Sequence, residues 1–168
     1  MSVEQAGPMD LKTSSTRELL GLYGSILEEL LSRGVIRTRN SPVGDYAERL
    51  VAKALNGALE PNSTASWDLV TPAGKRVQVK CRVVGPATSR SAKFSPFRSY
   101  NFDSSVFVVL EQGTYEVVSA ISVPSASVEA KARFSPHVAG ASITLGTNLL
   151  SLVGARDLTD LVRAAAEA

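Results

Sequence analysis

The sequence predicts one α/β domain, because stretches with helical spacing of apolar residues alternate along the chain with stretches of strand alternation. The chain has 168 residues, of which 44% are hydrophobic and 20% are charged, a balance typical of globular proteins. A chain of this length can bury a core without a disulfide or structural metal. We therefore expect residues 15–168 to form a single domain after a flexible lead of residues 1–14.

The first predicted element is a helix after that lead. Ser15 and Glu18 have the spacing of a capping box, and leucines recur at helical intervals from there until Gly34. This helix is an addition at the N-terminal side of the domain. Its broad apolar face predicts packing on the core, with dimerisation as the alternative.

A second helix is predicted over residues 41–57. Ser41 is suited to the N-cap and Pro42 to the first helical position, where its missing N–H costs nothing. At about 100° per residue, one face of this helix is apolar, and Glu48 lies at the margin of that face. Glu48 is either an ordinary boundary residue or a functional carboxylate.

A hairpin follows, with a short strand over residues 67–71, a turn at 72–74 and a longer strand over 75–84. Alternation in the second strand places four side chains on one face: Val77, Val79, Cys81 and Val83. The other face carries Arg76, Gln78, Lys80 and Arg82. Cys81 therefore has the position of a buried structural thiol.

The remaining chain is predicted as a loop followed by short elements. Residues 85–104 contain two prolines and no sustained periodicity, which indicates a long loop. We expect strands at 105–110, 114–121 and 142–145, helices at 124–133 and 157–166, and a loop at 133–136.

Charge is distributed unevenly although the net charge is only +2. No acidic residue occurs between Asp68 and Asp103. The candidates for contact with nucleic acid in or beside the predicted strand and loop are Arg76, Arg82, Arg90, Lys93 and Arg98. Such a segment predicts a local patch for a polyanion, with a solvated basic strand and loop as the alternative.

Three segments in order combine into a catalytic pattern: Glu48 on a helix, Asp68 on a strand, and Gln78-Val79-Lys80 on the paired strand. This arrangement resembles the PD-(D/E)xK nuclease superfamily, which includes many restriction endonucleases and Holliday junction resolvases. The resemblance covers about residues 41–84 and a later strand at 105–110. It implies a restriction-endonuclease-like fold, in which a mixed central sheet is flanked by helices.

The resemblance also implies the role of each residue. Asp68 would be the central metal ligand, Glu48 a second acid reaching the metal directly or through water, and Gln78 would take a position that is usually acidic. Lys80 would orient or deprotonate the attacking water. Oxygen ligands of this kind suit Mg²⁺, for which we expect Mn²⁺ to substitute.

The chain departs from the family pattern in three places. Trp67 stands where proline usually precedes the aspartate, Gln78 replaces the usual acid, and no helix is evident after the QxK strand. The first hypothesis is thus a Mg²⁺-dependent endonuclease acting on DNA. The alternative, favoured by the neutral amide of Gln78, is a non-catalytic nucleic-acid-binding or assembly domain on the same fold.

Other classes of function have little support. One cysteine and one histidine leave few soft metal ligands, and neither GxxxxGK[ST] nor GxGxxG occurs, so no nucleotide cofactor is expected. No apolar run is long enough for a membrane span, and no signal peptide is evident, so we expect a cytoplasmic protein. Cutting both strands of a duplex with single-site subunits would require a homodimer.

Overall fold

A computed structural model describes residues 10–61 and 66–167. The chain falls into two compact units, Met1–Pro42 and Val43–Ala168, which are taken separately below. Most of the predicted lead, residues 1–14, lies outside the described residues. Residues 10–14 form a turn in which the Thr13 N–H donates to the Asp10 carbonyl at 3.2 Å.

The first unit contains helix α1 (Thr16–Ser32). The predicted capping box is present: the Glu18 N–H donates to the Ser15 hydroxyl at 3.3 Å, and the Ser15 N–H donates to the Glu18 carboxylate at 2.7 Å. Leu27 is the buried residue of this helix, and its other leucines are half-buried or exposed. The expectation that this helix packs on the core stays a prediction. Within residues 10–42 no sheet is available to cover its apolar face.

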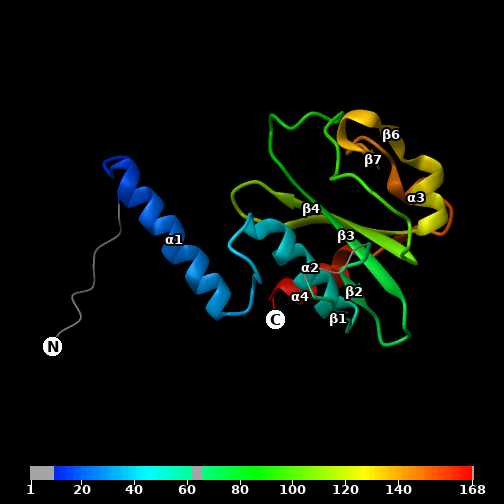
Figure 1. The fold of residues 1–168 in the computed structure, drawn as a ribbon, viewed down its shortest axis with the longest axis horizontal. Helices are drawn as coiled ribbons and strands as arrows, with labels where there is room; N and C mark the ends of the chain where they lie inside the picture. Colours follow the sequence, from blue (N-terminus) through cyan, green and yellow to red (C-terminus); the bar gives the residue numbers. More distant parts are fainter. Residues whose placement is uncertain (1–9, 62–65, 168) are drawn as a thin grey trace. The chain divides into compact units, whose positions relative to one another are not determined.

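The second unit is built on a mixed six-stranded sheet, which confirms the α/β class (Figure 1). Its strands, in spatial order, are β1 (Ala58–Leu59), β2 (Leu69–Val70), β3 (Arg76–Val84), β4 (Ser104–Glu111), β5 (Val117–Pro124) and β8 (Arg156–Asp157). Only the central pair β3 and β4 is parallel, and the other neighbours are antiparallel. The crossover between β3 and β4, residues 85–103, contains no helix, as the sequence indicates.

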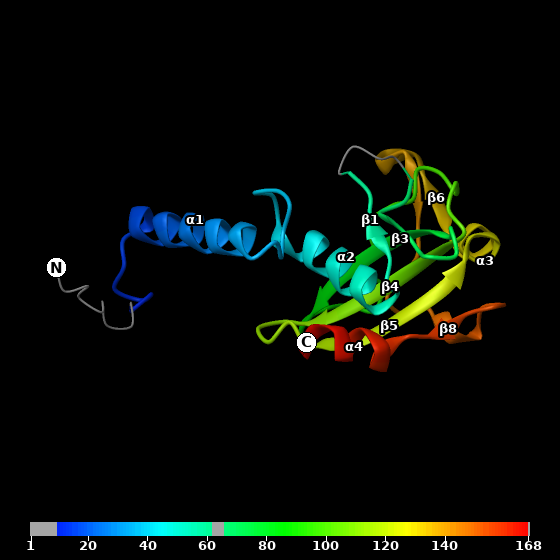
Figure 2. The same ribbon diagram turned by 90° about the horizontal axis from the view of Figure 1, so that it is seen from below.

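Three helices and a small hairpin complete this unit: α2 (Pro42–Ala54), α3 (Ser125–Lys131), α4 (Thr159–Glu167), β6 (Arg133–Ser135) and β7 (Gly140–Ser142). Two 3-10 turns, Pro136–Val138 and Leu149–Ser151, lie between them. The hairpin and α3 group together, away from α2 and α4 (Figures 1 and 2).

The two faces of the sheet carry separate cores. On one face Val77 and Val79 of β3 pack with apolar residues of α2 and with Val162 of α4. On the other face Phe107 of β4 packs with aromatic residues of the 85–103 crossover, its ring centroid 5.0 Å from that of Phe94. The crossover is thus a structural layer, which explains how a parallel pair forms without a helix.

Several predicted bounds need correction. The strand expected at 67–71 spans only Leu69–Val70. It begins late because the Val79 N–H donates to the Asp68 side chain, where a longer strand would offer it a backbone carbonyl. The strand expected at 114–121 is Val117–Pro124, since the preceding turn extends through Tyr115 at φ 58°. The strand expected at 142–145 is Gly140–Ser142, and the loop expected at 133–136 is largely β6, because these two segments pair with each other.

Candidate active site

Backbone and side-chain hydrogen bonds fix Asp68 at the entrance to β2. Its N–H donates to the Val77 carbonyl at 2.9 Å, and its carbonyl accepts from the Glu60 N–H at 2.9 Å. Its carboxylate accepts from the Val79 N–H at 2.6 Å. The carboxylate is therefore held against β3, between the positions of Gln78 and Lys80.

Gln78 lies opposite Asp68. The antiparallel register pairs Leu69 with Val77, so its continuation by one residue places Asp68 across from Gln78 on the same face of the sheet. The side-chain oxygen of Gln78 is buried and has no hydrogen-bond partner in the described part of the chain. Ser105, its register partner on β4, is fully buried, and its hydroxyl also has no partner there. Two buried polar oxygens thus lack a partner at neighbouring positions, which is costly unless a further group binds them.

Lys80 is the most unusual residue of this face, because its side chain is only 7% exposed. Its ammonium donates to the Pro96 carbonyl at 3.1 Å and lies 4.7 Å from the centroid of the Phe97 ring. Burial lowers the pKa of Lys80, the charges of Asp68 and then Glu48 oppose that shift, and the charge of Arg98 adds to it. The buried ammonium therefore lies in the field of both predicted acids.

Glu48 lies in a different layer from Gln78 and Lys80. It lies on α2, which packs on the face of Val77 and Val79, whereas Gln78 and Lys80 point to the opposite face. Its side chain is half-buried, and its effect on the Lys80 pKa is weaker than that of Asp68. Electrostatics therefore link all three charged residues, and the charge of Asp68 has a larger effect on the Lys80 pKa than that of Glu48.

The residue types of the candidate site are those that a hard divalent cation prefers. Asp68 and Glu48 would supply carboxylate oxygens and the unpartnered Gln78 oxygen a neutral one. Within residues 10–61 and 66–167, no group of three or more His, Cys, Asp or Glu side chains is placed to hold a metal. The candidate site has only two acids and an amide.

Four of the five predicted nucleic-acid contacts are exposed: Arg82, Arg90, Lys93 and Arg98. Arg76 is different, because its N–H donates to the Asp103 carboxylate at 2.8 Å and its guanidinium lies 3.6 Å from that carboxylate. The same guanidinium lies 5.1 Å from the Trp67 ring centroid. Arg76 is therefore engaged in the fold, whereas the other four are accessible to a polyanion.

Several residues around Lys80, Asp68 and Gln78 come from distant parts of the chain, and the sequence pattern does not predict their place in the site. Pro96 and Phe97 contact Lys80 from a crossover that gives no periodic signal. The indole N–H of Trp67 is buried without a partner in the described residues, whereas the sequence pattern places Trp67 only at the start of a strand, before Asp68. Ser105 falls in a predicted strand, but it is the parallel register that places it beside Gln78.

A scan against models of known protein families finds no match, and a search of curated protein sequences finds no significant relative. No helix in the described part of the chain is long and apolar enough to cross a membrane. The geometry of the chain itself therefore carries the functional argument.

Proposed function

We propose that this chain is a metal-dependent phosphodiesterase that cleaves DNA, with Glu48, Asp68, Gln78 and Lys80 as its active site on a restriction-endonuclease-like fold. The observation that carries the proposal is the buried Lys80 ammonium, which lies in the field of Asp68 and Glu48 beside an orphaned Gln78 oxygen. Buried titratable groups with specific charge partners occur preferentially at functional sites.

Asp68, Glu48 and Gln78 would hold Mg²⁺ or Mn²⁺, which when bound polarises the phosphoryl group and lowers the pKa of a coordinated water. Lys80 would act on the same phosphate and water. Its lowered pKa increases the fraction that is neutral at a given pH, and a neutral amine can accept a proton from water. In its charged form it stabilises the negative charge that develops on phosphate.

The exposed cations would bind the DNA backbone. The charge of Arg98 lowers the pKa of Lys80, so the same charge would attract a phosphate bound near Lys80. Arg90 and Lys93 extend the positive surface along the same crossover. Contacts of this kind to the DNA backbone contribute affinity but do not distinguish one base sequence from another.

The second candidate is a non-catalytic nucleic-acid-binding or assembly domain. The neutral amide at position 78 favours it, because two carboxylates attract a divalent cation less strongly than three. The two candidates share the DNA surface and differ in metal binding.

Two measurements on purified protein separate them. The first is cleavage of linear, branched and single-stranded DNA with and without Mn²⁺, and the second is calorimetric titration with Mg²⁺ or Mn²⁺. Asp68→Asn is the informative variant, since the amide oxygen can still accept from the Val79 N–H while the charge is removed. Asp160→Asn, at a carboxylate 98% exposed on α4, is the matched control.

The nuclease proposal requires saturable metal binding and cleavage that Asp68→Asn abolishes and Asp160→Asn retains. DNA binding without metal binding at millimolar concentration would favour the non-catalytic candidate. Lys80→Ala is expected to leave metal binding nearly intact and to remove turnover. If the protein cleaves DNA and Lys80→Ala keeps full activity, the active site lies elsewhere in the chain.

A further inference from the structure

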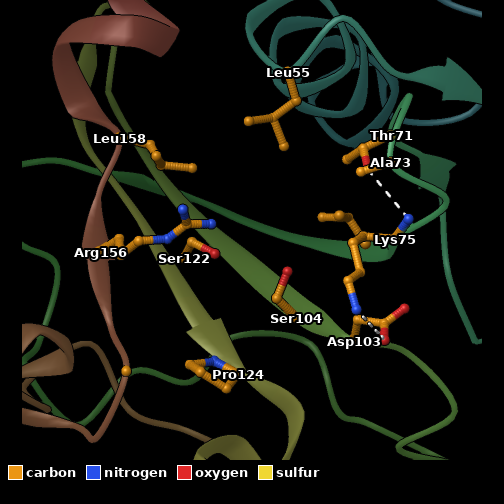
Figure 3. Close-up of a pocket in the computed structure, with 12 residues that line it drawn as sticks. Leu55, Thr71, Ala73, Lys75, Asp103, Ser104, Ser122, Pro124, Arg156 and Leu158 are labelled. Atoms are coloured by element: carbon orange, nitrogen blue, oxygen red, sulfur yellow. Dashed lines mark hydrogen bonds and ion pairs between the residues drawn. The ribbon is translucent and has the colours of Figure 1, made fainter.

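A second site lies on the opposite face of the sheet from Lys80. It is a pocket of about 440 Å³ between the end of α2, the β2–β3 turn, the ends of β4 and β5, and β8 (Figure 3). Val77 contributes to its lining, and the alternation of β3 points Val77 away from the face of Gln78 and Lys80. The volume is in the range of pockets that hold small organic molecules.

Hydroxyl groups form one side of this pocket. Ser122 is 4% exposed, and among the described residues its hydroxyl makes no hydrogen bond, nor does that of Ser104. Figure 3 shows both hydroxyls directed into the space that the lining residues enclose. Neither hydroxyl is among the buried polar atoms that lack a partner, so both open into the pocket, where each can donate to or accept from a ligand. This is the first observation that points to a ligand.

Charge provides the second observation. Ser122 of β5 is paired directly with Arg156 of β8, and the guanidinium of Arg156 extends over the Ser122 hydroxyl (Figure 3). Arg156 makes no ion pair within the described part of the chain. A guanidinium beside two free hydroxyls is a donor set for an anion.

The other charged groups of the lining leave the balance positive. The Lys75 ammonium lies 3.8 Å from the Asp103 carboxylate, which also interacts with Arg76. The pKa of Asp103 is lowered, mainly by the hydrogen bond from the Arg76 N–H, so this carboxylate stays ionised. Its negative charge is already balanced by Arg76 and Lys75. Two cations and one acid line the pocket, and Arg156 is the cation without a counter-charge.

Apolar walls define the rest of the ligand. Leu55 at the end of α2 and Leu158 before α4 line one side, and Pro124 lines another (Figure 3). An inorganic ion would leave these surfaces in contact with water. An organic anion would bury them while its head group meets the hydroxyls and the guanidinium.

We propose that this pocket binds a small organic anion, a phosphate monoester or a carboxylate, whose head group is held by Arg156, Ser122 and Ser104 and whose apolar body packs on Leu55 and Leu158. The proposal is independent of DNA cleavage, because none of the four candidate active-site residues lines the pocket. A protein without nuclease activity would still bind this ligand.

The test is calorimetric titration of the full chain with phenyl phosphate and with benzoate, which differ in head group, and with inorganic phosphate and benzyl alcohol. Arg156→Gln and Ser122→Ala are the variants, and Arg133→Gln, at an exposed arginine on β6, is the matched control. Melting curves followed by circular dichroism establish that each variant is folded.

We expect saturable binding of at least one aromatic anion, weakened about tenfold by Arg156→Gln and by Ser122→Ala and unchanged by Arg133→Gln. Preference for phenyl phosphate or for benzoate identifies the head group. Three results would overturn the proposal: no saturable binding of either aromatic anion at millimolar concentration, equal binding of inorganic phosphate, or equal loss in the Arg133→Gln control.

Discussion

The carboxylate of Asp68 accepts a hydrogen bond from the Val79 N–H at 2.6 Å. Val79 lies between Gln78 and Lys80 on β3, and its own side chain points into the opposite core. One backbone donor thus anchors the acid beside both residues of the QxK pair. Because the bond replaces a backbone ladder contact, the late start of β2, at Leu69, and the placement of Asp68 have the same cause.

Replacing Gln78 by glutamate should tighten metal binding. The amide oxygen of Gln78 has no partner in the described residues, and a carboxylate there would add a negative charge to the two of Asp68 and Glu48. Added charge at a hard-oxygen site increases affinity, here by about tenfold after the cost of desolvation. Titration with Mn²⁺ and with Mg²⁺ measures the change.

The matched control for this substitution is Gln112→Glu, in the turn after β4. The control should leave metal affinity unchanged. If Gln78→Glu also leaves metal affinity unchanged, the side chain of residue 78 lies outside the metal shell. The missing hydrogen-bond partner of the Gln78 oxygen then has a cause other than metal binding.

The exposed cations of the crossover should supply salt-dependent affinity. Replacing Arg90, Lys93 and Arg98 together by glutamine removes about three phosphate contacts, which should reduce the slope of log K against log salt concentration by about 2.7 for duplex DNA. Fluorescence anisotropy at several salt concentrations measures that slope. Equal slopes for the variant and the parent would remove this surface from the interface.

Helix α1 is proposed as the dimer contact. Leu20, Tyr23 and Ile26 are 66%, 48% and 47% exposed and recur at helical spacing, so they form an uncovered apolar stripe. Burial of one leucine contributes about 1.5–3 kcal/mol, so Leu20→Glu should weaken a dimer through this stripe by tenfold or more. Light scattering at micromolar concentration measures the mass, and Leu161→Glu, at a leucine 48% exposed on α4, is the control. A monomeric parent protein would contradict this proposal.

The local features of the site could be predicted from the sequence, because each depends on residues close together in the chain. Alternation in β3 separates Gln78 and Lys80 from Val77 and Val79, and the structure confirms that separation. The apolar face of α2 is likewise confirmed, with Leu50 and other apolar residues in the core. Periodicity reports which face of an element is buried, and these elements follow it.

The environment of Lys80 could not be predicted in the same way. Its burial depends on Pro96 and Phe97, which reach it through a crossover without periodic pattern. The two-residue strand β8 is too short for any alternation to appear, yet it places Arg156 beside Ser122. Pairing between distant segments decides both sites, and no local signal encodes it.

Cys81 should react very slowly with thiol reagents in the native protein. Burial raises its pKa from 9.0 to about 12, so the reactive thiolate is about a thousandfold rarer than in a free thiol at the same pH. Absorbance after addition of a disulfide reagent follows the reaction. One thiol per chain should react rapidly in guanidinium and slowly in native buffer. Rapid native reaction would show that the thiol is accessible and its pKa lower.

The buried charge of Lys80 should leave a signature in the pH dependence of stability. Burial lowers the pKa of Lys80 in the folded state below its ordinary value of 10.5. Between these two pKa values the unfolded chain binds more protons than the folded chain, so the contribution of Lys80 to the free energy of unfolding rises with pH. Below the folded pKa the penalty for the buried charge is constant, and above 10.5 it is absent.

Lys80→Met removes this titration while keeping an unbranched apolar side chain. The difference in free energy of unfolding between parent and Lys80→Met should therefore shift in favour of the parent as pH rises toward 10.5, with a slope of at most about 1.4 kcal/mol per pH unit. Cys81 contributes equally to both proteins, because it lies on the opposite face, and its effect cancels. Denaturant unfolding at several pH values measures the difference. If the free energies of unfolding of parent and Lys80→Met change in parallel with pH, the Lys80 pKa is the same in the folded and unfolded chain. The proposal that a neutral Lys80 amine accepts a proton from water would then lose its physical basis.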